Sequence, residues 1–150
     1  MIKRFFFVTA LIIISGCSIW AQSSNKCSDM AYENKNQVDP EPLVVKKITG
    51  QVVDNVSKSS ILLLDVCIGL FDEENEKLMF FTETNETGEF ELQNIPDGKY
   101  RLVVKNLTGG YCTANIPVKV DKNSRKKRQI SVKMVPPAID ECSYGELKDL

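Results

Sequence analysis

The stretch from Thr84 to Leu102 reads TNETGEFELQNIPDGKYRL, and it carries the strongest structural signals in the chain. Gly88 and Gly98 stand at two expected turns, because glycine takes a positive φ without a Cβ clash. Pro96 stands two residues before Gly98, and this Pro-Asp-Gly order is typical of a tight turn. The stretch therefore predicts strand, tight turn, strand, tight turn, strand, with Gly98 at a positive φ.

Apolar residues alternate with polar ones on both sides of the second turn. Phe90 and Leu92 lie two apart before it, and Tyr100, Leu102 and Val104 lie two apart after it. This alternation gives each strand one apolar face, which a second sheet must cover. Similar short segments, seven in all, are expected to be strands: 44–53, 61–71, 78–84, 89–92, 100–105, 113–120 and 128–134. Seven short strands separated by turn signals favour a two-sheet β-sandwich.

The residues of this stretch resemble the signature of the carboxypeptidase regulatory-like domain, the prealbumin-like or transthyretin-like β-sandwich. That signature reads T-[DN]-x-x-G-x-F-x-[FL] and then [LI]-P-x-G-x-Y-x-L, and Tyr100 holds its tyrosine position. Ile48, Gly50 and Val52 match the opening [IV]-x-G-x-V strand of the family. The resemblance implies an all-β, seven-stranded antiparallel Greek-key sandwich over residues 44–135. It also implies a scaffold and not a catalyst.

The N-terminus is typical of a bacterial export signal. Lys3 and Arg4 precede an apolar run from Phe5 to Ile14, which is too short to span a membrane as a helix. The following segment, Ile14 to Cys17, resembles the lipobox, in which the cysteine is lipidated and becomes the new N-terminus. The alternative is an ordinary cleavage after Ala21.

These features predict a signal peptide over residues 1–17, a flexible tether over 18–43 and a C-terminal tail over 136–150. The tether is polar and has no sustained hydrophobic period. A lipoprotein held in the cell envelope is expected, facing the periplasm or the cell surface. A soluble secreted or periplasmic protein is the alternative.

Four cysteines remain beyond Cys17, namely Cys27, Cys67, Cys112 and Cys142. An even number of cysteines in an exported chain is typical of disulfides, and no spacing resembles the CxxC of metal or redox sites. Of the three possible connectivities we favour Cys67 with Cys112 and Cys27 with Cys142. The alternative is that one or more stay as free thiols.

Charge and composition exclude several classes of function. Lys and Arg total 19 against 20 Asp and Glu, so nothing in the charge favours nucleic acid. The chain has no histidine, which excludes Ser-His-Asp and Cys-His nucleophiles, imidazole acid-base catalysis and His-liganded zinc. No catalytic residue, cofactor or metal is therefore expected.

Two features are candidates for binding. The run from Arg125 to Arg128 is basic, and it suits anionic headgroups or lipopolysaccharide, or else a solvated hairpin tip. Four aromatic residues are candidates for a sugar platform but are scattered along the chain: Phe71, Phe81, Tyr111 and Tyr144. The sequence thus favours a non-catalytic structural or protein-interaction module with an unknown envelope partner. The alternative is a carbohydrate- or peptide-binding module, the peptide adding as a strand.

Overall fold

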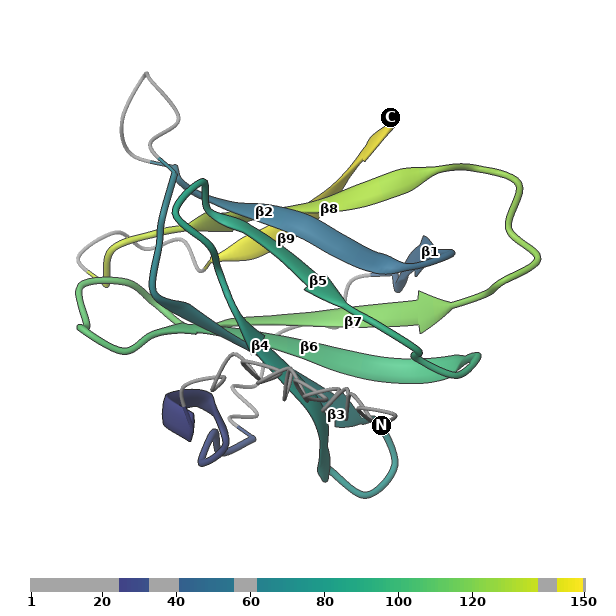
Figure 1. The fold of residues 1–150 in the computed structure, drawn as a ribbon, viewed down its shortest axis with the longest axis horizontal. Coiled ribbons are helices and arrows are strands. Elements are labelled where there is room, and N and C mark those ends of the chain that lie inside the picture. The colour runs from purple at the N-terminus through teal and green to yellow at the C-terminus, as the bar shows by residue number, and fades with distance from the viewer. Residues whose placement is uncertain (1–24, 33–40, 56–61, 138–142, 150) are drawn as a thin grey trace, which may run out of the picture.

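The computed structural model describes residues 25–32, 41–55, 62–137 and 143–149. In these residues two β-sheets pack face to face, and there is no α-helix (Figure 1). The elements are the 3₁₀ turn η1 (Asn25–Cys27) and the strands β1 (Leu43–Val45), β2 (Ile48–Asp54), β3 (Val66–Asp72), β4 (Leu78–Glu83), β5 (Glu89–Leu92), β6 (Gly98–Asn106), β7 (Ala114–Val120), β8 (Arg128–Met134) and β9 (Tyr144–Asp149).

The two sheets have the strand orders β1-β7-β6-β3-β4 and β5-β2-β8-β9. The predicted β-sandwich is therefore confirmed. Its detail differs from the expectation, because the described residues form nine strands and the pairs β1 with β7 and β2 with β8 are parallel. One added strand, β1, is split from β2 where the chain crosses between the sheets, and the other, β9, lies in the expected tail.

The hydrophobic core fills the space between the sheets. Val66, Ile68 and Leu70 of β3 are fully buried. They meet side chains of the facing sheet, including Ile48 of β2 and Ile130 of β8, which are also fully buried. Burying a side chain of this size contributes about 1.5–3 kcal/mol, so the alternating pattern selects which face of each strand turns inward.

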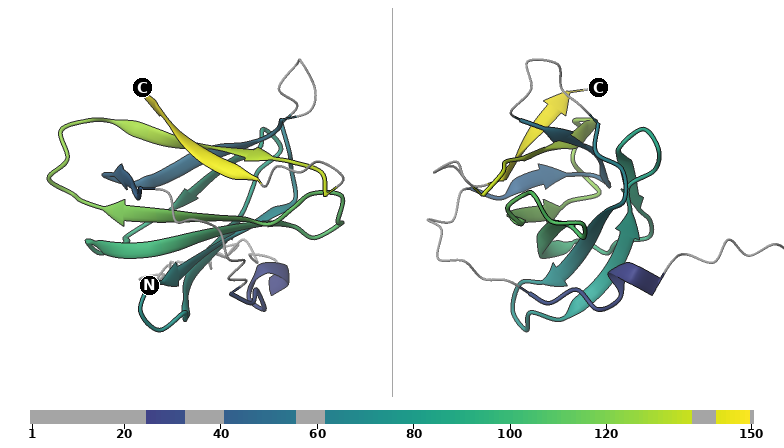
Figure 2. Two further views of the ribbon diagram at one scale, coloured as in Figure 1. Left: turned by 180° about the vertical axis from the view of Figure 1, so that it is seen from behind. Right: turned by 90° about the vertical axis from the view of Figure 1, so that its left-hand side faces the viewer.

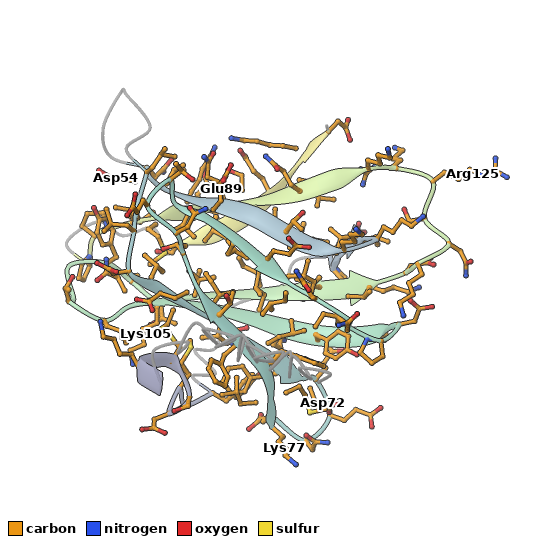
Figure 3. All side chains as sticks on the ribbon, in the orientation of Figure 1. Asp54, Asp72, Lys77, Glu89, Lys105 and Arg125 are labelled. Carbon is orange, nitrogen blue, oxygen red and sulfur yellow. A yellow bond between two sulfur atoms is a disulfide. The ribbon has the colours of Figure 1, made fainter. Side chains whose placement is uncertain are left out.

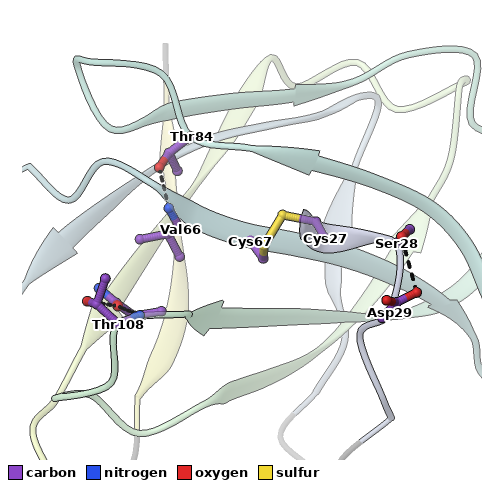
Figure 4. Close-up of a disulfide and its surroundings, with 8 residues drawn as sticks. Cys27, Ser28, Asp29, Val66, Cys67, Thr84 and Thr108 are labelled. Atoms are coloured by element: carbon purple, nitrogen blue, oxygen red, sulfur yellow. Dashed lines mark hydrogen bonds between the residues drawn. A yellow bond between two sulfur atoms is a disulfide. The ribbon is translucent and has the colours of Figure 1, made fainter. Parts of the chain in front are cut away.

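The turn at residues 84–88 carries the chain from one sheet to the other, and it is not a hairpin within a single sheet. At its start, Thr84 donates its backbone N–H to the Val66 carbonyl and accepts the Val66 N–H on Oγ1, both at 3.0 Å (Figure 4). At its end, the Gly88 carbonyl accepts the Val52 N–H at 2.8 Å. Gly88 has φ 68°, so the predicted positive φ is confirmed there. Five residues are thus fixed to β3 at one end and to β2 at the other.

Asn85 organises the interior of this turn. Its Oδ1 accepts the backbone N–H groups of Thr87 at 3.0 Å and Glu89 at 2.9 Å, and the Thr87 hydroxyl at 2.8 Å. Asparagine and aspartate are favoured in such turns because a short side chain carries the acceptor oxygen.

Gly98 does not have the positive φ that the sequence predicted. The left-handed residue of the β5–β6 loop is Asn94, with φ 59°. A Cβ at Gly98 would instead lie 3.2 Å from the ring atoms of Tyr100. The glycine is therefore needed so that the tyrosine ring can fold over the backbone, and not for an unusual backbone conformation.

Gly50→Ala should lower the free energy of unfolding by about 3 kcal/mol, because the site is overpacked. The added Cβ would meet the Ile130 carbonyl oxygen and lie 2.6 Å from Phe90 Cζ. Urea titration of the oxidised protein measures the loss. Gly109→Ala is the control, since a Cβ there meets nothing within 4 Å and only the φ of 79° opposes it, at about 1 kcal/mol. Equal losses would contradict this account of Gly50.

Asn85→Ala should lower the free energy of unfolding by about 2 kcal/mol, because two backbone N–H groups lose their acceptor. Asn85→Asp keeps an acceptor oxygen and should lose about half as much, through repulsion from the nearby Glu89 carboxylate. The same urea titration compares the two variants. A loss in the aspartate variant as large as that in the alanine variant would show that the acceptor is not what stabilises the turn.

Candidate functional site

The turn residues singled out by the sequence have structural roles. The Tyr100 hydroxyl donates a hydrogen bond to the Pro96 carbonyl at 3.1 Å, which closes the β5–β6 loop. Burial raises the pKa of Tyr100, and the carboxylates of Asp72 and Asp97 raise it further. Its phenol therefore stays protonated as a donor.

Three chain segments meet at one end of the sandwich. They are the β1–β2 crossing at residues 46–47, the β5–β6 loop and the β7–β8 loop. The Asp97 Oδ1 accepts the Lys122 backbone N–H at 3.0 Å, which ties the second segment to the third. The Asp121 N–H donates to the Val45 carbonyl at 2.9 Å, which ties the third to the first.

The β1–β2 crossing forces two lysines outward. Val45 and Ile48 are both fully buried, so the two residues between them span the gap from one sheet to the other. Lys46 and Lys47 are exposed as a result.

A cavity of about 520 Å³ lies among these segments. The buried apolar side chains of Ile48, Leu92 and Ile95 line it. Its remaining lining residues are polar and exposed: Lys46, Lys47, Lys122, Glu91, Gln93 and Asn94. The volume is in the range that holds small ligands.

The β7–β8 loop adds further positive charge beside this cavity. Arg125, Lys126 and Lys127 are exposed in the loop, and Arg125 projects from its tip (Figure 3). Arg128, the last residue of the predicted basic run, belongs to β8 and pairs with Asp149 at 3.2 Å. We define the basic end as the six exposed cations of this region: Lys46, Lys47, Lys122, Arg125, Lys126 and Lys127.

No ion pair involves a residue of the basic end within the part of the chain that the structure describes. The acids of the cavity lining and of the two loops are Glu91, Asp97 and Asp121. The Asp97 and Asp121 carboxylates accept backbone N–H groups of the loop itself, including that of Asn123 at 2.9 Å. Six cations against three acids leave a local excess of positive charge. The sequence revealed only the run in the β7–β8 loop, because the lining lysines lie far apart along the chain.

A disulfide joins Cys27 of η1 to Cys67 of β3, with a Cα–Cα distance of 5.4 Å (Figure 4). The predicted pairing of Cys67 with Cys112 is therefore wrong. Cys67 alternates with inward residues and faces the outer side of its sheet, whereas the Cys112 N–H donates to the Val135 carbonyl beyond β8, at 2.7 Å. The predicted pairing of Cys27 with Cys142 is also wrong, because Cys27 is bonded to Cys67. Cys142 itself lies outside the described residues.

Cys112 carries a free, partly buried thiol. The expectation of disulfides is thus confirmed for one pair, and the alternative of a free thiol holds for Cys112. The Cys112 carbonyl accepts the Ser143 hydroxyl at 2.7 Å, and that hydroxyl in turn accepts the Val135 N–H at 2.9 Å. This bridge fastens the start of β9 beside the β6–β7 loop.

The disulfide fixes a segment that the sequence assigned to the tether. Tyr32 packs against Phe71 with ring centroids 5.6 Å apart, and a Cβ at Gly69 would lie 3.1 Å from the Met30 sulfur. Cys27 is almost fully buried. Residues 25–32 therefore cover the outer face of β3 and belong to the folded unit. Residues 18–24 and 33–40 of the predicted tether lie outside the described residues.

The four candidate aromatic residues do not form a platform. Phe71 is buried beneath Tyr32, and Tyr111 packs partly buried against the core. Phe81 lies exposed on β4, in the first sheet. Tyr144 lies exposed on β9, in the second sheet, with the Lys133 ammonium 5.5 Å from its ring centroid.

A family model described as the CarboxypepD_reg-like domain matches residues 48–141, which is more than half of the chain. The chain belongs to this family. The CarboxypepD_reg-like domain is a non-catalytic β-sandwich module, and the match covers every strand from β2 to β8. Among curated proteins no match was found.

Two further findings concern the described residues of this CarboxypepD_reg-like domain. Their cysteine, aspartate and glutamate side chains form no group of three or more that could hold a metal ion. None of their helical segments has the length and apolar character needed to cross a membrane.

Cys27→Ala should lower the free energy of unfolding by about 3 kcal/mol, because the 40-residue separation closed by the disulfide restricts the unfolded chain. Guanidinium titration under oxidising conditions measures the loss, and non-reducing peptide mapping should join Cys27 to Cys67. Cys112→Ala is the matched control and should change stability by less than half as much, since its thiol makes no disulfide. A map that joins Cys67 to Cys112 would contradict the structure.

Proposed function

We propose that the protein is exported, lipidated at Cys17 and held at the cell envelope, where its β-sandwich acts as a non-catalytic structural or protein-interaction module. The membrane is then one partner, through the lipid, and an envelope protein is the other. Neither nucleic acid nor a cofactor has a part in this role. In this role the sandwich is a stable folded domain that other envelope proteins can contact from the periplasm or the cell surface.

The observation that carries this proposal is the Cys27–Cys67 disulfide. Structural disulfides form and persist in oxidising compartments such as the periplasm and the cell surface. This supports the export signal expected over residues 1–17. Membership of a non-catalytic family supports the absence of an enzymatic role.

The second candidate is a carbohydrate- or peptide-binding module. The cavity at the basic end favours a small-ligand or glycan role, because it combines an apolar lining with exposed amides and lysines. A peptide role has a weaker basis, namely that among the described strands β9 pairs with β8 alone and leaves its other edge for strand addition.

Cys17→Ala should abolish incorporation of labelled fatty acid and move the protein from the membrane fraction to the soluble fraction. The thiol is the atom that would carry the lipid, so alanine removes the attachment point. Metabolic labelling and fractionation of the expressed full chain measure both effects. Ser18→Ala is the control and should label as the parent does.

Intact mass of the mature protein separates the two proposed exits from the signal peptide. A lipidated N-terminus at Cys17 supports the anchor, whereas an unmodified chain that starts after Ala21 refutes it. A parent protein that never labels, together with a Cys17→Ala variant that stays membrane-bound, would also refute it.

A further inference from the structure

We propose that the basic end binds an anionic polysaccharide, with a negatively charged sugar seated in the cavity between the β1–β2 crossing, the β5–β6 loop and the β7–β8 loop. This inference deepens the second candidate function. It rests on the proposed envelope location in one step only, where the position of the lipid anchor is used to favour a polysaccharide over a membrane surface as the ligand.

The charge of the site selects an anion. Lys46, Lys47 and Lys122 all line the cavity, and Glu91 is the only acid among its lining residues. A concave site lined mainly by one sign of charge concentrates the field and raises the local concentration of counter-ions. Arg125, Lys126 and Lys127 of the β7–β8 loop continue this charge beyond the cavity, so an extended polyanion meets them after its first unit is bound.

The lining of the cavity suits a sugar ring. Ile48 is fully buried, and the exposed edges of Leu92 and Ile95 offer a small apolar contact for the C–H face of the ring. The exposed amides of Gln93 and Asn94 offer donors and acceptors for hydroxyl groups. A simple inorganic anion would leave the apolar part of the cavity unused.

The loops that form the site are held before any ligand binds. The hydrogen bond of Asp97 to the Lys122 N–H, that of Asp121 to Val45 and that of Tyr100 to Pro96 each fix one of them. A site held in this way loses little conformational freedom on binding.

The position of the site favours a polysaccharide over a lipid headgroup. η1 lies at one end of the sandwich and the β7–β8 loop lies at the other, as two opposite views show (Figures 1 and 2). The disulfide fastens the N-terminal segment at the η1 end. If Cys17 is anchored in a membrane, the seven residues between it and Asn25 reach at most about 26 Å, so the η1 end is tethered closer to the membrane than the basic end is.

The test uses the full oxidised chain and three soluble polymers: dextran sulfate, neutral dextran of the same length, and polygalacturonate. The parent should bind at least one of the two polyanions, should not bind neutral dextran, and should bind more weakly as salt rises. Isothermal titration calorimetry measures the affinities. Failure of the parent to bind either polyanion overturns the proposal.

The variant Lys46→Gln/Lys47→Gln/Lys122→Gln should bind the polyanion on the order of 10-fold more weakly than the parent. All three side chains are exposed, so the fold should persist, and circular dichroism and the urea midpoint verify this. An affinity equal to that of the parent overturns the proposal.

The matched control is Lys26→Gln/Lys77→Gln/Lys105→Gln, which removes the same charge away from the cavity. It should keep most of the parent affinity. If both triple variants weaken binding equally, the effect is one of net charge, and the proposed site is wrong.

Vesicles that contain phosphatidylglycerol separate the two sources of anionic groups. If the parent binds these vesicles through the three cavity lysines and binds neither soluble polyanion, the partner is a membrane surface and the proposal fails. These measurements are made in solution and do not depend on lipidation. Failure of the Cys17 experiment therefore leaves their result intact, and the reverse also holds.

Discussion

The sandwich depends on the turn at residues 84–88, which passes from one sheet to the other while bonded to both. Thr84 exchanges hydrogen bonds with Val66 of β3, and Gly88 accepts one from Val52 of β2. The spacing of these bonds brings β3 and β2 to a fixed separation, and the apolar faces of both strands then close on each other. The exposed Asn85 side chain accepts two more backbone N–H groups, those of Thr87 and Glu89, beside the backbone bonds that the turn forms itself.

Much of this architecture could be predicted from the sequence, because the alternation of apolar and polar residues along a strand indicates which face of the strand is buried. The segment 89–92 was predicted with the bounds that β5 has, and β6 to β8 differ from prediction by two residues or fewer at each end. β9 was missed because its residues are mostly half-buried or exposed, so it has no alternating apolar pattern. Gly98 was misread because a glycine after Pro-Asp signals a turn, whereas here the ring of Tyr100 is what requires it.

The position of residues 25–32 could not be predicted from their own sequence pattern, but the sequence of β3 indicates that some segment covers its outer face. Its residues are buried on both faces, although the strand lies in a sheet whose outer side should meet water. Cys67, Gly69 and Phe71 on that side imply a cover, and residues 25–32 supply it. The lysines of the cavity were beyond such reasoning, since only the meeting of three loops brings them together.

The Cys27–Cys67 bond also changes what a protease can do to this molecule. It closes a covalent ring from residue 27 to residue 67, so one cut anywhere within that ring leaves both products linked. A nicked chain would keep its N-terminal segment, and with it any lipid, attached to the sandwich until the disulfide is reduced. Release of the domain by a cut within this ring then requires two chemical events, a cleavage and a reduction, whereas a cut between Cys17 and Cys27 would require one.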